Sequence, residues 1–167
     1  VSERAELHKT IWRIANDLRG SVDGWDFKSY VLGFLFYRFI SENITDYCNK
    51  LMADAGVPNP DYANMSDKTA ENAREQIINA KGFYILPSQL FINVANGASK
   101  NTELNTTLAN NFKAIEQSAI GKPSENDVKG LFSNFNTNDN GLGTTVAERN
   151  ELLTTLLESV RDLNFTT

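Results

Sequence analysis

The sequence has little that could bind a metal or form a disulfide. Its 167 residues include one cysteine, Cys48, and one histidine, His8. A lone thiol forms no internal disulfide and supplies no cluster of thiolate ligands, which fits a reducing compartment. The N-terminus lacks the charged, apolar and small-residue order of a signal peptide. We therefore expect a cytoplasmic protein.

Long apolar runs and an excess of basic residues are also absent. The longest nearly apolar run, residues 30–40, contains Arg38 and is far shorter than the roughly 20 residues that span a bilayer. The chain has 16 Lys and Arg against 21 Asp and Glu, for a formal charge of −5. Basic side chains that neutralise phosphates supply most non-specific DNA affinity. The isolated chain is therefore not expected to bind duplex DNA by itself.

What remains is typical of one globular domain. Apolar residues make up 41% and charged residues 22% of the chain, and the length suits a single core. We treat residues 1–167 as one domain. Because the first residue is Val1 rather than methionine, we expect the chain to be a piece of a longer protein.

The strongest local pattern is an aromatic-rich segment that begins after a polar turn at residues 21–24. Its apolar residues recur at helical spacing. They are Phe27, Tyr30, Val31, Phe34, Leu35, Phe39 and Ile40. Leu32 and Phe36 widen this face, which predicts a helix that reaches about Ala53 and is covered by neighbours over most of its circumference.

A shorter amphipathic segment precedes that turn. Residues 4–18 are predicted to form a helix that ends before a capping glycine, Gly20. Its apolar edge consists of Leu7, Ile11, Ile14, Ala15 and Leu18. Its other side is charged, and Arg13 and Asp17 are spaced to pair.

Later segments also favour helices. We expect them over residues 69–80, from Pro87 to Gly97 and over 102–119. Capping boxes are expected at Ser124 with Asp127 and at Thr145 with Glu148, and the second of these opens the last helix, which includes Leu152 and Leu163. Residues 83–87 are too few to found a sheet, and residues 133–143 read as a surface loop. The predicted fold is all-α, a single irregular bundle of about seven or eight helices.

Several segments, in chain order, resemble the N-terminal helical domain of the modification (M) subunit, HsdM, of type I restriction-modification systems, the adenine-specific DNA methyltransferase subunit. The matching segments are Leu18-Arg19-Gly20, Asp26, the run from Tyr30 to Ser41, Phe83-Tyr84-Ile85-Leu86-Pro87, Glu103-Leu104-Asn105 with Ala114-Ile115-Glu116, Gly130-Leu131-Phe132 with Phe135, and Arg149 to Phe165. Together they cover nearly the whole chain.

The resemblance implies a non-catalytic part of a DNA methyltransferase. In that family two M subunits join one DNA-specificity subunit, methylate adenine at N6 with S-adenosylmethionine, and associate with restriction subunits. The N-terminal domain helps to close the complex around duplex DNA and to sense its methylation state. The cofactor and catalytic domain would follow residues 1–167, so no catalytic, cofactor-binding or metal-binding residue is expected in this chain.

Three motifs resemble functional sites but lack residues that those sites need. The string Asn59-Pro60-Asp61-Tyr62 resembles an amino-methylating loop but lacks a second proline and is interpreted as a turn. The segment from Asn136 to Gly141 resembles half of a calcium loop, yet Ala147 stands where a bidentate glutamate is needed. His8 has no partner at a spacing that indicates a general base.

Four basic residues near the family motif are the candidate DNA contacts. They are Arg13, Arg19, Lys28 and Arg38. One alternative is that they are solvated or paired locally, Arg38 with Glu42 at i+4, for example. The other is that some of them meet phosphates once partner subunits complete a positive channel.

Two rival functions remain open at this point. One is a stand-alone helical adaptor that docks a protein partner and has no role with DNA. The other is an enzyme of unrecognised type, which the lack of paired catalytic motifs disfavours. A methyltransferase domain encoded after Thr167, beside a specificity-subunit gene, would favour the M-subunit reading over the adaptor.

Overall fold

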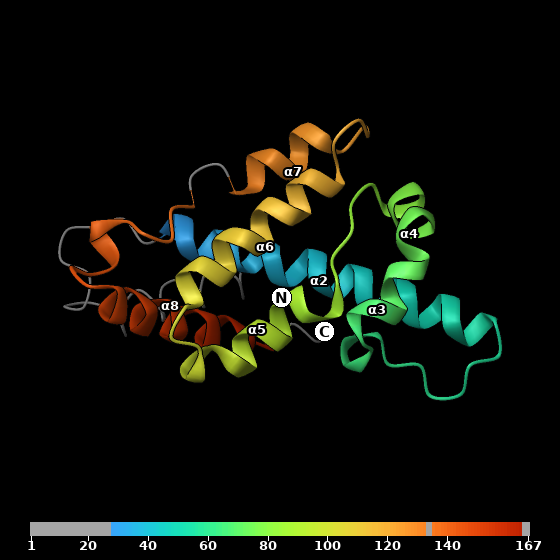
Figure 1. The fold of residues 1–167 in the computed structure, drawn as a ribbon, viewed down its shortest axis with the longest axis horizontal. Helices are drawn as coiled ribbons and strands as arrows, with labels where there is room; N and C mark the ends of the chain where they lie inside the picture. The colour runs from blue at the N-terminus through green and yellow to red at the C-terminus, as the bar shows by residue number, and fades with distance from the viewer. Residues whose placement is uncertain (1–27, 133–134, 165–167) are drawn as a thin grey trace, which may run out of the picture.

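In the computed structural model, residues 28–132 and 135–164 are described, and all of their regular secondary structure is helical (Figure 1). The α-helices are α2 (Lys28–Asp54), α3 (Asp67–Ala70), α4 (Arg74–Lys81), α5 (Phe91–Gly97), α6 (Leu104–Ser118), α7 (Glu125–Phe132) and α8 (Val146–Arg161). Short 3₁₀ turns are η1 (Tyr62–Asn64), η2 (Glu71–Ala73), η3 (Pro87–Gln89), η4 (Ala98–Lys100) and η5 (Asn140–Leu142). The predicted helix over 4–18 lies outside the described residues.

The all-α class is confirmed, but the predicted number of helices is wrong. Within the described ranges five helices reach eight residues, whereas α3 has four residues and α5 has seven. The predicted helix over 69–80 is divided by the 3₁₀ turn η2. Pro87 starts η3 rather than α5, which begins only at Phe91. Tighter 3₁₀ turns are common connectors at helix ends, and periodicity alone does not separate them from α-helix.

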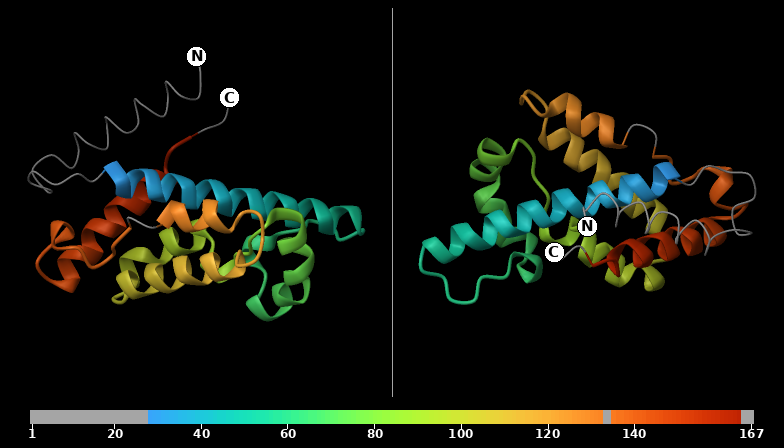
Figure 2. Two further views of the ribbon diagram at one scale, coloured as in Figure 1. Left: turned by 90° about the horizontal axis from the view of Figure 1, so that it is seen from above. Right: turned by 180° about the vertical axis from the view of Figure 1, so that it is seen from behind.

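The long helix α2 organises the fold. It runs along one edge of the described helices (Figure 2) and packs against α4, α5, α7 and α8. Its fully buried or nearly buried side chains are Tyr30, Val31, Phe34, Tyr37, Ile40, Ser41, Ile44 and Cys48. Two expectations for this helix are wrong, because Phe39 is exposed rather than buried, and Leu32 and Phe36 are exposed rather than covered.

Polar side chains fix the extended segment before α5. The Tyr37 hydroxyl donates to the Gln89 carbonyl. The Phe91 amide donates to Ser41 Oγ at 3.0 Å, and the Tyr62 hydroxyl donates to the Ile85 carbonyl at 2.6 Å. Within residues 83–86 the amides of Tyr84 and Leu86 donate to the side chains of Ser118 and Gln89, and the segment forms no strand, as predicted.

Helices α6 and α8 confirm the predicted buried faces. The buried residues are Leu104, Leu108, Phe112 and Ile115 on α6, with Leu152, Leu153, Leu156, Leu157 and Val160 on α8 and Leu163 just after it. Between them the buried Asn150 accepts from the Asn105 amide at 3.0 Å and donates to the Thr102 carbonyl at 3.0 Å. One side chain of α8 thus supplies the missing partner of an α6 N-terminal amide.

The segment predicted as a surface loop, residues 133–143, is partly core. Thr137 and Leu142 are buried. The ring centroid of Phe135 lies 4.8 Å from those of Tyr30 and Phe34 and 5.0 Å from that of Phe112. The polar composition of the segment predicts a surface loop. Composition does not reveal that one aromatic ring, Phe135, packs against Tyr30, Phe34 and Phe112.

The predicted capping boxes form only in part. Thr145 Oγ1 accepts from the Glu148 amide at 3.1 Å, but the Glu148 carboxylate accepts from the amide and hydroxyl of Thr144, one residue earlier than expected. Ser124 donates instead to the Gly82 carbonyl at 2.7 Å, and the Asp127 side chain lies outside the described residues. No helix in the described part of the chain is long and apolar enough to cross a membrane.

Candidate interaction surface

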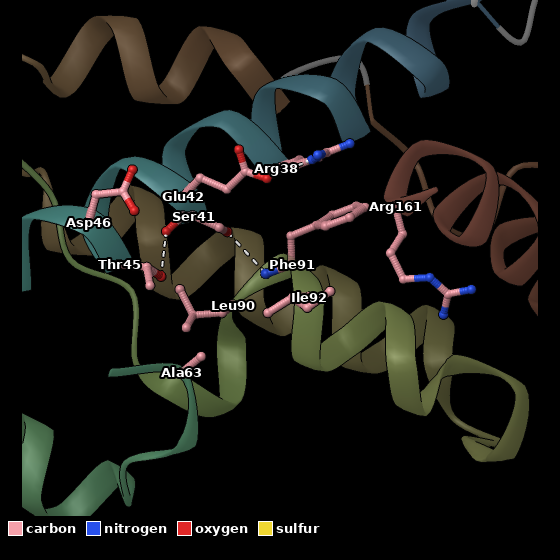
Figure 3. A pocket seen from close by; sticks show the side chains of 10 residues that line it. All are labelled: Arg38, Ser41, Glu42, Thr45, Asp46, Ala63, Leu90, Phe91, Ile92 and Arg161. Atoms are coloured by element: carbon pink, nitrogen blue, oxygen red, sulfur yellow. Dashed lines mark hydrogen bonds and ion pairs between the residues drawn. The ribbon is translucent and has the colours of Figure 1, made fainter. Parts of the chain in front are cut away.

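A cavity of about 240 Å³ opens where α2, α5 and the end of α8 meet (Figure 3). Its lining combines charged residues of α2 and α8 with apolar residues around the start of α5. These residues are Arg38, Ser41, Glu42, Thr45, Asp46, Ala63, Leu90, Phe91, Ile92 and Arg161. Pockets that bind cofactors usually measure about 300–1,000 Å³. This cavity suits one or two side chains of a partner protein better than a nucleotide-sized ligand.

Arg38 forms one wall of the cavity and joins two helices. Its Nη1 donates to the carbonyls of Val160 and Leu163 at 2.8 and 2.7 Å. Its Nε donates to Glu42 Oε1 at 2.7 Å. The carbonyls in the last turn of a helix lack intrahelical partners, so this guanidinium satisfies the C-terminal end of α8 with a favourable charge for the helix dipole.

The other charged residues that line the cavity lie on two sides of its apolar residues. Figure 3 shows Glu42 and Asp46, one turn apart on α2, above Leu90, Phe91 and Ile92, with Arg161 on the α8 side. Arg161 donates through Nε to Asp162 at 2.9 Å and through Nη1 to Asn96 at 3.2 Å. Because Glu42 is paired with Arg38, Asp46 is the acidic residue of α2 at the cavity that has no ion pair with Arg38, and an exposed aliphatic residue, Ile92, also lines the cavity.

Of the four predicted DNA-contact residues, only Arg38 has a described side chain. Arg13 and Arg19 lie outside the described residues, and so does the side chain of Lys28, the first residue of α2. Arg38 is described, and the alternative that it pairs with Glu42 is confirmed. A DNA contact for any of the four stays a prediction.

The interpretation of residues 59–62 as a turn is confirmed. Asn59 has a positive φ of 50°, and Tyr62 is buried at the start of η1. The Tyr62 amide donates to Asn49 Oδ1 at 2.8 Å, and burial raises the pKa of its phenol. This ring is held in the core and is not free to stack on a flipped base.

Side-chain oxygens in the loop that resembles a calcium site serve as local hydrogen-bond acceptors. Asn136 Oδ1 accepts from the Asn138 amide, Asp139 Oδ1 accepts from the Gly141 amide, and Asn138 Oδ1 accepts from Asn105 Nδ2. Within the described ranges no group of three or more His, Cys, Asp or Glu residues is placed to hold a metal. His8 lies outside those ranges.

Sequence reasoning missed the cavity beside Arg38 and the link of Arg38 to α8. Glu42 was noted only as a partner for Arg38, and Asp46 and Arg161 were not singled out. Arg38 and Val160 are 122 positions apart, so no local spacing could have signalled that they meet. The one available clue was an arginine within a mostly apolar helix, which indicated a specific partner.

A second, wider groove of about 610 Å³ lies between η4 and α8. Small and hydroxyl-bearing residues line it, together with Glu151 and Glu158, and no Lys or Arg is among its lining residues. A groove of this charge repels phosphate groups, so it offers no binding site for the DNA backbone.

Comparison with known proteins gives a consistent result. Residues 7–160 match the family described as the HsdM N-terminal domain. The chain is 44% identical, over 169 aligned positions, to the type I restriction enzyme MpnII methylase subunit of Mycoplasma pneumoniae. That alignment covers 96% of this chain and 31% of the relative.

The fold is similar to that of a solved protein as well. A crystal structure of the methyltransferase subunit of a type I restriction-modification system from Streptococcus thermophilus matches with a TM-score of 0.75 at 22% identity. The match covers 98% of this chain and 35% of that one. The chain therefore spans about a third of the length of these relatives.

Proposed function

Because the chain belongs to the HsdM N-terminal domain family, we propose that it is the non-catalytic N-terminal domain of a type I M subunit. In this role it helps assembly with a DNA-specificity subunit, a second M subunit and a restriction subunit, and it helps to clamp duplex DNA. Adenine N6 methylation, with S-adenosylmethionine as donor, belongs to the two thirds of the relatives that this chain does not span. The family match over residues 7–160 is the observation that carries the proposal.

The geometry of the cavity favours contact with protein over chemistry. An occupant that fits it is a lysine or arginine side chain of the partner, with its aliphatic stem on Ile92 and its charged head beside Asp46. Long basic side chains commonly bury their stems in this way. Complementary charge at the rim of an interface acts on the association rate and on specificity.

A charge reversal on α2 tests this assembly surface. In the full M subunit, Asp46→Lys should weaken association with the specificity subunit about tenfold, measured by surface plasmon resonance. Asp54→Lys is the matched control, because Asp54 is also an exposed aspartate of α2 but does not line the cavity. Equal affinity for both variants and wild type would place the assembly surface elsewhere.

The sequence contains no Gly-rich loop of the kind that binds S-adenosylmethionine, and a binding experiment can test this prediction. Titration of the 167-residue chain with S-adenosylmethionine should give no saturable heat, while the full M subunit should give a saturable signal. Saturable binding of S-adenosylmethionine by the 167-residue chain at micromolar concentration would contradict the proposal that the cofactor site lies in the rest of the M subunit.

The DNA role is best tested through Arg19. Arg38 is a poor choice, because its side chain also holds the end of α8. In the assembled methyltransferase, Arg19→Glu should lower DNA affinity and reduce the dependence of the affinity on salt by about one phosphate contact. Lys50→Glu makes an equal charge change at an exposed position late in α2. This variant controls for the effect of net charge on DNA affinity. Identical affinities for wild type and both variants would remove Arg19 from the DNA interface.

A further inference from the structure

The groove between η4 and α8 is long enough to hold a segment of another chain. Its α8 side extends from Val146 to Glu158, which are about 18 Å apart along the helix axis. The opposite side is formed by Ala98, Ser99, Asn101 and Thr102. No lining residue is shared with the cavity beside Arg38, so the groove is a separate surface.

Two carboxylates give the groove its charge. Glu151 and Glu158 are the only charged residues among the described residues that line it. They are seven positions apart on α8, so they lie on the same side of the helix, about 10 Å apart along its axis. Neither takes part in a salt bridge with another described residue. Arg161, which follows Glu158 by three positions, pairs instead with Asp162 at 2.9 Å.

Several neutral polar groups of the groove are already used within the protein. The Asn101 side chain donates to Thr107 Oγ1 at 3.0 Å, and Asn150 bonds to two backbone groups near the start of α6. Thr155 Oγ1 donates to the carbonyl of Glu151 at 3.1 Å. Recognition of an occupant therefore depends mainly on the two carboxylates.

These carboxylates favour an occupant with two separate positive charges. A divalent cation takes about six or more oxygen ligands in one place, whereas the groove supplies two carboxylates from positions two helical turns apart. A second copy of this chain has a formal charge of −5 and would add negative charge to the interface. Two basic side chains of a different protein meet the requirement, one at each carboxylate.

We propose that this groove binds a basic segment of a partner subunit. Two Lys or Arg side chains of that segment, about 10 Å apart as at positions i and i+7 of a helix, reach Glu151 and Glu158. Val146 is 47% exposed at one end of the groove and offers an apolar contact for the stem of a long basic side chain. The inference rests on the proposed function, because it requires that the chain acts within an assembly of subunits.

Charge reversal in the full M subunit tests the groove. Glu151→Lys combined with Glu158→Lys should weaken association with the partner subunits about tenfold at low salt, and the loss should shrink as salt rises. The control combines Asp54→Lys with Glu75→Lys, which change the net charge equally at exposed positions outside the groove. Surface plasmon resonance measures both. Equal affinities of the two double variants, whether unchanged or weakened alike, would overturn the inference.

The same measurement separates failure of this inference from failure of the proposed function. If Asp46→Lys weakens association while the groove variant does not, the groove is not a binding site and the proposed function stands. If the unmodified M subunit associates with no partner subunit, the proposed function fails and the inference fails with it.

Carboxyl labelling tests whether the two glutamates are covered in the complex. Carbodiimide-activated labelling, followed by mass spectrometry, should modify Glu151 and Glu158 in the free M subunit and severalfold less in the complex. Labelling of the exposed Glu75 should be the same in both. Unchanged labelling of the groove glutamates would contradict partner binding. Protection that appears as the concentration of the M subunit alone rises would also contradict it, because a second copy would then be the occupant.

Discussion

At the residue scale, Gly33 illustrates why one position of a helix excludes a side chain. A Cβ placed there would lie 2.5 Å from Phe135 Cδ2. The ring of Phe135 also packs between Tyr30 and Phe34 of the same helix. The glycine lets the ring of Phe135 pack directly against the backbone of α2.

Gly33→Ala should therefore destabilise the domain. Displacing the ring costs about 1–3 kcal/mol, and the better helix propensity of alanine offsets about 1 kcal/mol of this. We expect a net loss in the free energy of unfolding, measured by urea denaturation. Gly97→Ala is the control, because nothing lies within 4 Å of a Cβ at that position. A Phe135→Leu background should reduce the cost of Gly33→Ala, and an unchanged cost would show that Phe135 is not its cause.

Arg38 shows the same dependence on a distant contact. Arg38→Gln removes two hydrogen bonds to the carbonyls of Val160 and Leu163, and bonds from a charged donor contribute about 1.5–3 kcal/mol each. We expect at least about 2 kcal/mol less free energy of unfolding in urea. Arg161→Gln should cost much less, because the Nε of that arginine pairs with the exposed Asp162. Equal losses would mean that the link between α2 and α8 contributes little.

These residues also mark what sequence reasoning could not reach. Periodicity identified the buried faces of α2, α6 and α8, since burial along a helix follows local spacing. The contact of Phe135 with Gly33 and that of Arg38 with Val160 join segments about a hundred or more positions apart. Only the folded chain reveals such pairs, and the cavity beside Arg38 was missed for the same reason.

At the scale of elements, two glutamates on different helices should respond to pH in opposite directions. Hydrogen bonds from Thr144 hold the pKa of Glu148 below its ordinary value of 4.5. Burial raises the pKa of Glu116, on α6, above 4.5. The folded state thus favours the charged form of Glu148 and the neutral form of Glu116.

The signs follow from linkage between protonation and folding. Glu148 contributes stability above pH 4.5 that is lost as the pH falls through its folded pKa, whereas Glu116 favours folding more as the pH falls toward 4.5. Glu148→Gln should lower the free energy of unfolding at pH 7 and flatten its decline in acid. Glu116→Gln should raise the free energy of unfolding at pH 7, because it removes a charge that the folded state disfavours. Thermal unfolding of both variants between pH 3 and 7 measures this, and shifts of the same sign would contradict the assignment.

Element boundaries proved harder to predict than element type. The sequence patterns placed α2, α6 and α8 within a few residues of their observed bounds, because long amphipathic segments give a clear period. The region from residue 62 to 100 instead alternates between short α-helices and 3₁₀ turns. There Tyr37 and Ser41 of α2 fix the backbone from outside the segment, so the composition of the segment does not by itself determine where each turn ends.

At the scale of the whole molecule, α2 connects regions that could unfold together or separately. Its first half packs with Phe135, and its second half carries Cys48 among residues of η1, α3 and α4. The Cys48 thiol is buried, and burial raises its pKa to about 11. Because the thiolate is the reactive form, labelling at pH 8 requires the structure around Cys48 to open.

Labelling of Cys48 therefore reports whether the chain folds as one unit. With a stability of about 5 kcal/mol or more, labelling by a thiol reagent should be on the order of a thousandfold slower than in denaturant. If unfolding is cooperative, Gly33→Ala should accelerate labelling by the factor that corresponds to its loss of free energy, even though Gly33 lies 15 residues earlier in α2. Unchanged labelling in that variant would show that the two ends of α2 belong to separately unfolding regions, contrary to the single domain predicted for residues 1–167.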